Sequence, residues 1–148
     1  MRRFEWLAAG TFLFALACTS QASAQRWNRN GGEAVAGGYD VVAYQTEGRA
    51  RRGRASISYR YEGGTFWFAT EENRDAFAAA PARYVPAYGG FCAYAMADGR
   101  RVRIDPEAFS VVGGRLYLNY SPSVKRQWLE DRDDYIDSAN EHWQRLRR

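Results

Sequence analysis

Cysteine and histidine are scarce in this chain, whose 148 residues contain two cysteines and one histidine. Cys18 lies in an N-terminal apolar stretch, and Cys92 is the only thiol beyond it. Once that stretch is removed, Cys92 has no partner for an intramolecular disulfide, so the fold depends on packing. The sequence also contains no C-x-x-C pair, nucleotide-binding loop, nucleophile elbow or zinc-protease motif, and it therefore does not indicate those enzyme classes.

Long hydrophobic runs are absent after the first 24 residues. Within them, Arg2 and Arg3 precede a mostly apolar run over residues 6–17, and the small residues 22–24 (Ala-Ser-Ala) follow. A positive start, a short apolar core and a small-residue cleavage site predict a secretory signal peptide over residues 1–24. We therefore expect an exported, periplasmic protein.

Cys18 leaves a second kind of processing open. The stretch "FALAC" is similar to a lipoprotein signal in which Cys18 carries the lipid, although Ala15 stands where the bacterial lipobox has leucine. Beyond the leader, no segment is long and apolar enough to span a bilayer. We expect no transmembrane segment in the mature chain.

The basic charge is almost entirely arginine, with a single lysine and a formal net charge of +4. Two arginine runs each follow a turn-like pair of an acidic residue and glycine: Arg49, Arg51, Arg52 and Arg54, then Arg100, Arg101 and Arg103. Such runs serve either as solvated faces or as contacts to an anion or an anionic membrane surface. No recognition element lies beside them, and we expect no nucleic-acid partner.

The mature chain is short enough for one domain. Residues 25–38 are polar and rich in glycine, so we expect a flexible lead-in there. Structure is expected to begin near Tyr39, with a single domain over residues 39–146.

Two segments of the chain resemble one another. When Gly63-Gly64 is placed on Gly113-Gly114, the aromatic and apolar residues that follow also match, at an offset of 50 residues. Further on, Phe77 matches Trp128 at an offset of 51. In each segment, two strand-like runs flank the glycines, which is a strong hairpin signal.

A helix is predicted after each hairpin. Thr70 is expected to cap the first helix, and Ser121-Pro122 to begin a second helical region over 122–146, interrupted around 131–134. The predicted fold is α+β: a compact single domain of two ββα-like halves, with short hairpins packed by helices. This pattern is consistent with an internal duplication.

Three stretches resemble exported bacterial YHS-domain proteins: "GYDVVAY", "ENRDAF…P.RY.P.YGGFCAYA" and "GRLYLNY". The resemblance covers about residues 38–146. It implies no established activity, because this exported group has none. Other YHS domains are similar to small metal-binding modules with paired cysteines. The present sequence has no such pair, so the resemblance does not imply a metal site here.

Cys92 has several interpretations. As a nucleophile it needs a base, and His142 is the only histidine. As a soft-metal ligand it would act with Met96, four residues on, if 91–97 is helical; a thiolate with a thioether suits Cu(I). As a core residue it would match Val42 at an offset of 50, a small apolar position. A redox-sensing or partner-linked thiol is a further alternative.

The aromatic residues around Cys92 suggest a pocket at the junction of the halves. The candidate ligand-binding residues are Tyr44, Tyr88, Cys92 and Tyr94. The sequence thus favours a non-enzymatic exported module that binds a small ligand, a soft metal or an envelope protein. The alternatives are a thiol-dependent enzyme or redox protein centred on Cys92, and an envelope interaction protein that uses an arginine-rich face.

Overall fold

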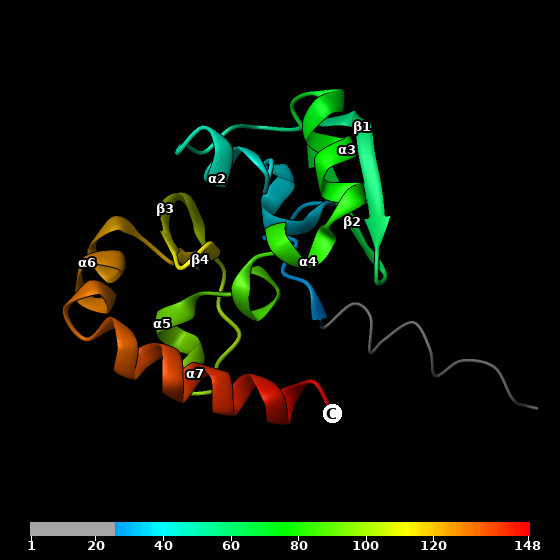
Figure 1. Cartoon of the computed structure of the whole chain (residues 1–148). Coiled ribbons are helices and arrows are strands. Elements are labelled where there is room, and N and C mark those ends of the chain that lie inside the picture. Colours follow the sequence, from blue (N-terminus) through cyan, green and yellow to red (C-terminus); the bar gives the residue numbers. More distant parts are fainter. Residues whose placement is uncertain (1–25) are drawn as a thin grey trace, which may run out of the picture.

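Two short antiparallel hairpins, each followed by a helix, organise the structure (Figure 1). The computed structural model describes residues 26–148. Its first half contains the 3-10 turn η1 (Val35–Gly38), α2 (Ala43–Thr46), β1 (Arg54–Tyr61), β2 (Gly64–Phe68), α3 (Glu71–Ala79) and α4 (Pro81–Tyr84).

The second half repeats this order of elements. It contains η2 (Ala87–Gly90), α5 (Ala93–Met96), β3 (Asp105–Val112), β4 (Arg115–Asn119), α6 (Pro122–Glu130) and α7 (Arg132–Leu146). The fold is a mixed α+β single domain, as the sequence predicted. Whether the repeated order arose by duplication stays a prediction.

The hairpin turns correct the alignment of the two halves by one residue. The turn of the first hairpin is Glu62-Gly63 and that of the second is Gly113-Gly114, all four with positive φ. This is the primed geometry that matches the twist of the flanking strands. Gly64 is therefore not a turn residue but the first residue of β2, and it occupies the place of Arg115 in the second hairpin.

An irregularity in strand pairing recurs at the same place in both hairpins. In the first it falls between Arg54 and Ser58, and in the second between Asp105 and Phe109. Such an irregularity locally disrupts the ladder of hydrogen bonds between the strands. The similarity of the two halves therefore extends to a local backbone detail.

Helix caps agree with the sequence prediction. The Thr70 hydroxyl accepts a hydrogen bond from the Asn73 backbone N–H (3.1 Å), and the Ser121 hydroxyl accepts one from that of Val124 (3.2 Å). Each satisfies one of the free N–H groups at a helix start. The predicted interruption is also present, because non-helical backbone at Asp131 separates α6 from α7.

The turns η1 and η2 share an unusual backbone. Ala36 (φ 55°) and Tyr88 (φ 58°) both adopt the left-handed region, and two glycines follow each of them. Non-glycine residues are uncommon in this region. Because both halves contain it, this conformation belongs to the fold rather than to one site.

The expected flexible lead-in is wrong for residues 26–38. Trp27 and Asn28 are buried, and the Trp27 indole N–H donates to the Glu62 carbonyl (3.1 Å). The Asn28 backbone N–H donates to the Gly89 carbonyl (2.8 Å). The polar composition misled the prediction because Asn28 forms hydrogen bonds to the second half of the chain. Trp27, in turn, packs against the first hairpin.

Asn30 makes a two-way bond across the molecule. Its side-chain amide donates to the Ile104 carbonyl (2.9 Å), and its Oδ1 accepts from the Ile104 backbone N–H (2.9 Å). Asn30, near the start of the described residues, is thus hydrogen-bonded to the residue that precedes β3.

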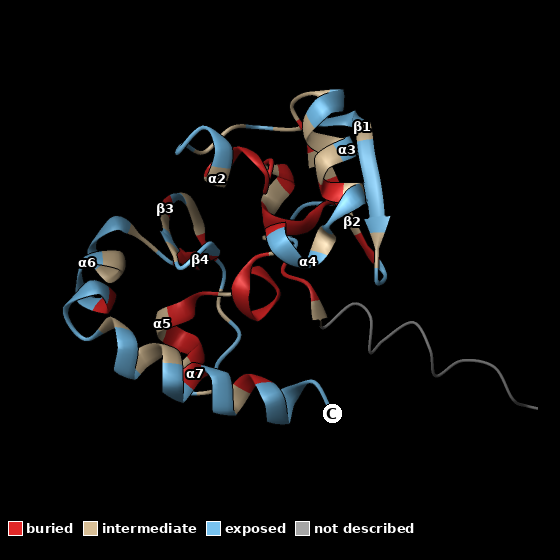
Figure 2. Cartoon of the chain, in the orientation of Figure 1, coloured by how far each residue is buried: buried red, intermediate tan, exposed pale blue. Residues whose placement is uncertain are grey.

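The buried residues form two clusters, which Figure 2 shows as the red interior. The first includes Tyr44, Phe66, Phe68, Phe77, Cys92, Leu116 and Leu118. The second includes Tyr88, Met96, Tyr117, Trp128 and Trp143. Large aromatic side chains bury much area each, which compensates for a short chain without disulfides.

In the part of the chain that the structure describes, no helix combines the length and apolarity needed to cross a membrane. The predicted signal peptide and Cys18 lie outside the described residues.

Candidate ligand-binding cleft

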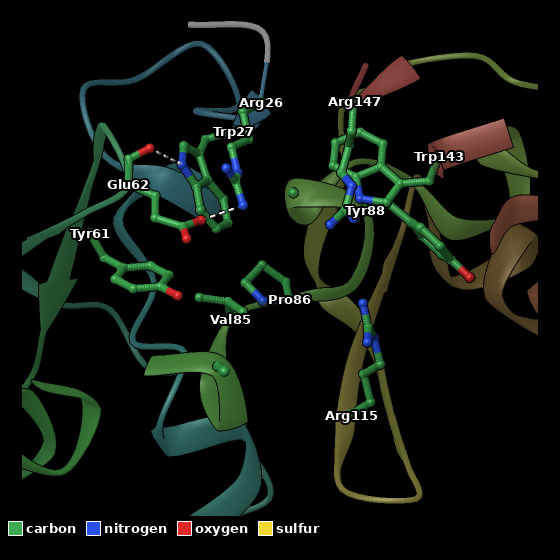
Figure 3. Close-up of a pocket in the computed structure, with 12 residues that line it drawn as sticks. Arg26, Trp27, Tyr61, Glu62, Val85, Pro86, Tyr88, Arg115, Trp143 and Arg147 are labelled. Atoms are coloured by element: carbon green, nitrogen blue, oxygen red, sulfur yellow. Dashed lines mark hydrogen bonds and ion pairs between the residues drawn. The ribbon is translucent and has the colours of Figure 1, made fainter. Parts of the chain in front are cut away.

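A cleft of about 230 Å³ opens where the two halves meet (Figure 3). The N-terminal segment, the tip of the first hairpin and α4 border it from one half, and η2, the start of β4 and the end of α7 from the other. Its lining residues are Arg26, Trp27, Tyr61, Glu62, Ala82, Val85, Pro86, Tyr88, Gly89, Arg115, Trp143 and Arg147.

Gly89 allows the N-terminal segment to approach η2 closely. A Cβ atom at this position would collide with the Arg26 carbonyl oxygen and would lie 3.1 Å from the Trp143 ring. Gly89 also has a φ of +62°, which favours glycine. One edge of the cleft therefore depends on a residue without a side chain.

Aromatic rings give the cleft two firm walls. On one side, Trp27 packs edge-on against Phe66, with ring centroids 5.1 Å apart. On the other, Tyr88 packs against Trp143 at 6.4 Å. These rings are held by the core behind them, so the walls exist without a ligand.

The Tyr88 hydroxyl does not point into the cleft. It lies 3.1 Å from Asn140 Oδ1 and 3.3 Å from the Ile136 carbonyl, both on α7, and Figure 3 shows it directed away from the open space. Burial raises the pKa of Tyr88, against a lowering by the nearby Arg115 charge. Tyr88 therefore stays neutral and contributes its ring and backbone.

The charges of the cleft do not balance. Arg26 forms an ion pair with Glu62. Arg115 and Arg147 have no carboxylate partner within ion-pair distance among residues 26–148. The cleft therefore holds two uncompensated positive charges.

Of the four predicted ligand-binding residues, only Tyr88 lines this cleft. Tyr44 is buried in the first cluster, where its hydroxyl donates to the Pro106 carbonyl (2.8 Å). Tyr94 is half-buried and packs against Tyr135 at 5.0 Å. The aromatic residues near Cys92 in the sequence are thus distributed over both clusters rather than gathered around one space.

Cys92 is 1% exposed, as expected of a core residue. Its sulfur lies 3.6 Å from Asn119 Oδ1. The premise that Cys92 and Met96 share a helical face is wrong, since α5 begins at Ala93 and Cys92 has extended backbone (φ −54°, ψ 120°). The Cys92 side chain packs in the first cluster and the Met96 side chain in the second.

The equivalence of Cys92 with Val42 is also wrong. The Cys92 backbone N–H donates to the Val102 carbonyl (3.0 Å), just as that of Asp40 donates to the Arg51 carbonyl (2.8 Å). Each of these two residues comes directly after a tyrosine or phenylalanine that ends η1 or η2. Cys92 therefore matches Asp40, and two extra residues separate Asp40 from its following helix.

His142 lies on α7, where its Nδ1 is 2.9 Å from the Ser138 carbonyl. Its ring packs against Gly99. Across residues 26–148, no cluster of three histidine, cysteine or acidic side chains could hold a metal ion.

The two arginine runs are engaged locally. Arg51 pairs with Glu47 (2.9 Å), and the Arg52 guanidinium lies 5.1 Å from the Tyr39 ring centroid. In the second run, the Arg103 guanidinium lies 5.2 Å from the centroid of the Tyr120 ring. Neither run lines the cleft.

Sequence reasoning missed most of the cleft. Trp27 was assigned to a flexible segment, and Arg115 and Arg147 stand outside the arginine runs. One sequence signal for the cleft was present. A tryptophan and an arginine lie close together in the sequence near each end of the folded region, as Arg26-Trp27 and as Trp143 and Arg147.

No protein-family model, curated protein or solved structure matches this chain. The resemblance to YHS-domain proteins therefore remains a prediction.

Proposed function

We propose that this chain is a non-enzymatic module that binds a small molecule in the cleft between its halves. The observation that carries the proposal is a preformed space of about 230 Å³ with aromatic walls from both halves. Ligand sites are usually preformed hollows in which a few polar groups orient the ligand, and this cleft is preformed, although more of its lining is polar than apolar. The volume is below the ~300–1,000 Å³ of pockets for drug-sized molecules, so the ligand is smaller than these.

The chemistry of the lining favours binding over catalysis. The cleft contains no thiol, imidazole or aliphatic hydroxyl, and its single carboxylate, Glu62, is paired with Arg26. Nucleophilic catalysis needs a nucleophile within reach of a base. Positioned aromatic rings and guanidinium groups instead supply shape and charge recognition.

Tryptophan signals provide a direct test. Trp27 and Trp143 line the cleft, whereas Trp67 and Trp128 lie outside it. Screening small fragments against the 15N-labelled full chain should reveal compounds that shift the indole signals of Trp27 and Trp143 while those of Trp67 and Trp128 stay in place. If no fragment does so, or if the signals of Trp67 and Trp128 shift together with those of Trp27 and Trp143, the proposal fails. Single Trp→Phe variants assign the signals.

We also propose export as the setting of this activity, on the basis of the N-terminal pattern of Arg2, Arg3 and residues 6–24. Mass spectrometry of the protein recovered from a bacterial periplasm should give a mature chain that begins at Gln25. A chain that begins at Cys18 with an added lipid mass would instead establish the lipoprotein alternative.

A further inference from the structure

We infer that the molecule bound in the cleft is a small organic anion, a carboxylate carried on a flat apolar ring. This inference rests on the proposed function and specifies the ligand class for that site.

The charge of the cleft favours an anion. Arg115 enters from the start of β4 and Arg147 from the end of α7. Figure 3 shows the Arg115 guanidinium directed along the cleft toward Tyr88 and Arg147. An anion placed between these two guanidinium groups would be attracted by both of them.

Guanidinium groups favour a planar partner. Their fixed fork of N–H donors matches the two oxygens of a carboxylate and makes paired hydrogen bonds. Arg115 and Arg147 are both exposed, so the attraction depends on this paired geometry rather than on exclusion of water.

A second feature selects a monoanion over a multiply charged anion. The Arg26 charge is already compensated by Glu62, and the Glu62 carboxylate itself borders the cleft. A phosphate dianion would be repelled by Glu62, whereas a carboxylate carries half that charge. A carboxylate held by Arg115 and Arg147 offsets part of the positive charge of the lining and places less negative charge near Glu62 than a dianion would.

The remaining lining offers several flat faces. Val85 and Pro86 lie between the two aromatic walls, and Tyr61 faces them from the first hairpin (Figure 3). A planar ring can lie against tyrosine, proline and tryptophan over its whole face. The ring of an aryl carboxylate would thus contact the aromatic walls, and its carboxylate would contact the arginine pair.

Benzoate is the probe that tests this class. Titrated into the 15N-labelled full chain, benzoate should shift the indole signals of Trp27 and Trp143. Benzamide, a neutral molecule of the same shape, should bind about tenfold more weakly or worse, because it lacks the charge-assisted bonds. Inorganic phosphate, which has no ring, should leave both signals in place.

Variants assign the effect to the two arginines. Arg115→Gln and Arg147→Gln should each weaken benzoate binding by about tenfold or more and leave benzamide unaffected. Arg126→Gln is the matched control, because Arg126 is exposed on α6 away from the cleft, and it should bind benzoate as the unmodified chain does. The 15N spectrum of each variant verifies its folding.

The outcomes separate the two proposals. If benzamide binds as tightly as benzoate, if phosphate binds more tightly, or if other fragments occupy the cleft and benzoate does not, the ligand class is wrong while the binding function stands. If neither benzoate nor any fragment shifts Trp27 and Trp143, the binding function itself fails.

Discussion

Asp40 and Cys92 occupy the same place in the two halves, but only Asp40 accepts hydrogen bonds from the backbone there. The Asp40 carboxylate accepts hydrogen bonds from the backbone N–H groups of Val42 (2.9 Å) and Ala69 (2.9 Å). It thereby joins the short helix to the residue that follows the second strand. In the second half the strand supplies that link, because Asn119 Oδ1 accepts from the Tyr94 backbone N–H (3.0 Å). The Cys92 thiol accepts none of these backbone bonds; it packs in the core and donates a weak hydrogen bond to the same Asn119 Oδ1 (3.6 Å).

Replacing Asp40 should be severe. Asp40 is fully buried, and its oxygens also accept from Ala43 N–H (3.1 Å) and Asn73 Nδ2 (2.8 Å). Asp40→Ala removes the acceptor of four donors, two of them buried and two partly buried, so we expect a loss of roughly 3 kcal/mol in the free energy of unfolding. Urea denaturation measures this loss. A loss below about 1 kcal/mol would show that other groups or water satisfy these donors.

The Cys92 thiol should react slowly in the native protein. It is 1% exposed, so a thiol reagent reaches it mainly after local or global unfolding. In a Cys18→Ser background, labelling with a maleimide should be slow in buffer and rapid in concentrated urea. Fast labelling of the folded protein would contradict this and would favour the redox alternative.

Gly89 should be far less replaceable than Gly113, although both have positive φ (+62° and +58°). A side chain at Gly113 meets nothing within 4 Å, so Gly113→Ala has only the backbone cost of about 1–2 kcal/mol. Gly89→Ala must also displace the Arg26 carbonyl, and we expect a clearly larger loss. Thermal unfolding of the two variants compares them. Equal losses would mean that the N-terminal segment does not pack against η2.

Tyr44 should make the fold sensitive to alkali. Burial, followed by the charge of Tyr39, raises the pKa of Tyr44 above its ordinary value of 10.0. The folded state therefore keeps a proton that the unfolded chain releases. This stabilisation is fully present below about pH 10 and declines above it by about 1.4 kcal/mol per pH unit.

Unfolding free energies measured between pH 9 and 11.5 should show this decline, and Tyr44→Phe should make the slope shallower. At pH 7 the same variant should cost only about 1 kcal/mol, the value of the lost hydrogen bond to the Pro106 carbonyl. An unchanged alkaline slope in Tyr44→Phe would contradict the assignment.

Local signals predicted most of the fold. Thr70 and Ser121 cap the helices as expected, because capping depends on a few adjacent residues. The hairpins were also predicted, but with the first turn placed one residue late. Glu62 was not expected in the left-handed region, which side chains rarely adopt.

The cleft could not be predicted in the same way, because its walls come from distant parts of the chain. Trp27, Arg115 and Trp143 meet only through long-range packing, and no local pattern connects them. Polar residues such as Asn28 looked like a linker, since composition alone does not reveal that their bonds are made to the second half.

The ties of Asn28 and Asn30 have a consequence for the order of folding. Asn28 Nδ2 bonds to the Gly90 carbonyl (3.0 Å), and Asn30 bonds to Ile104 in both directions. The Asn28 bond needs the chain as far as Gly90, and the Asn30 bonds need it as far as Ile104. Contacts of such long sequence separation close late and slow folding. The first half therefore completes its contacts only when residues as far as Ile104, about two-thirds along the chain, are available to it.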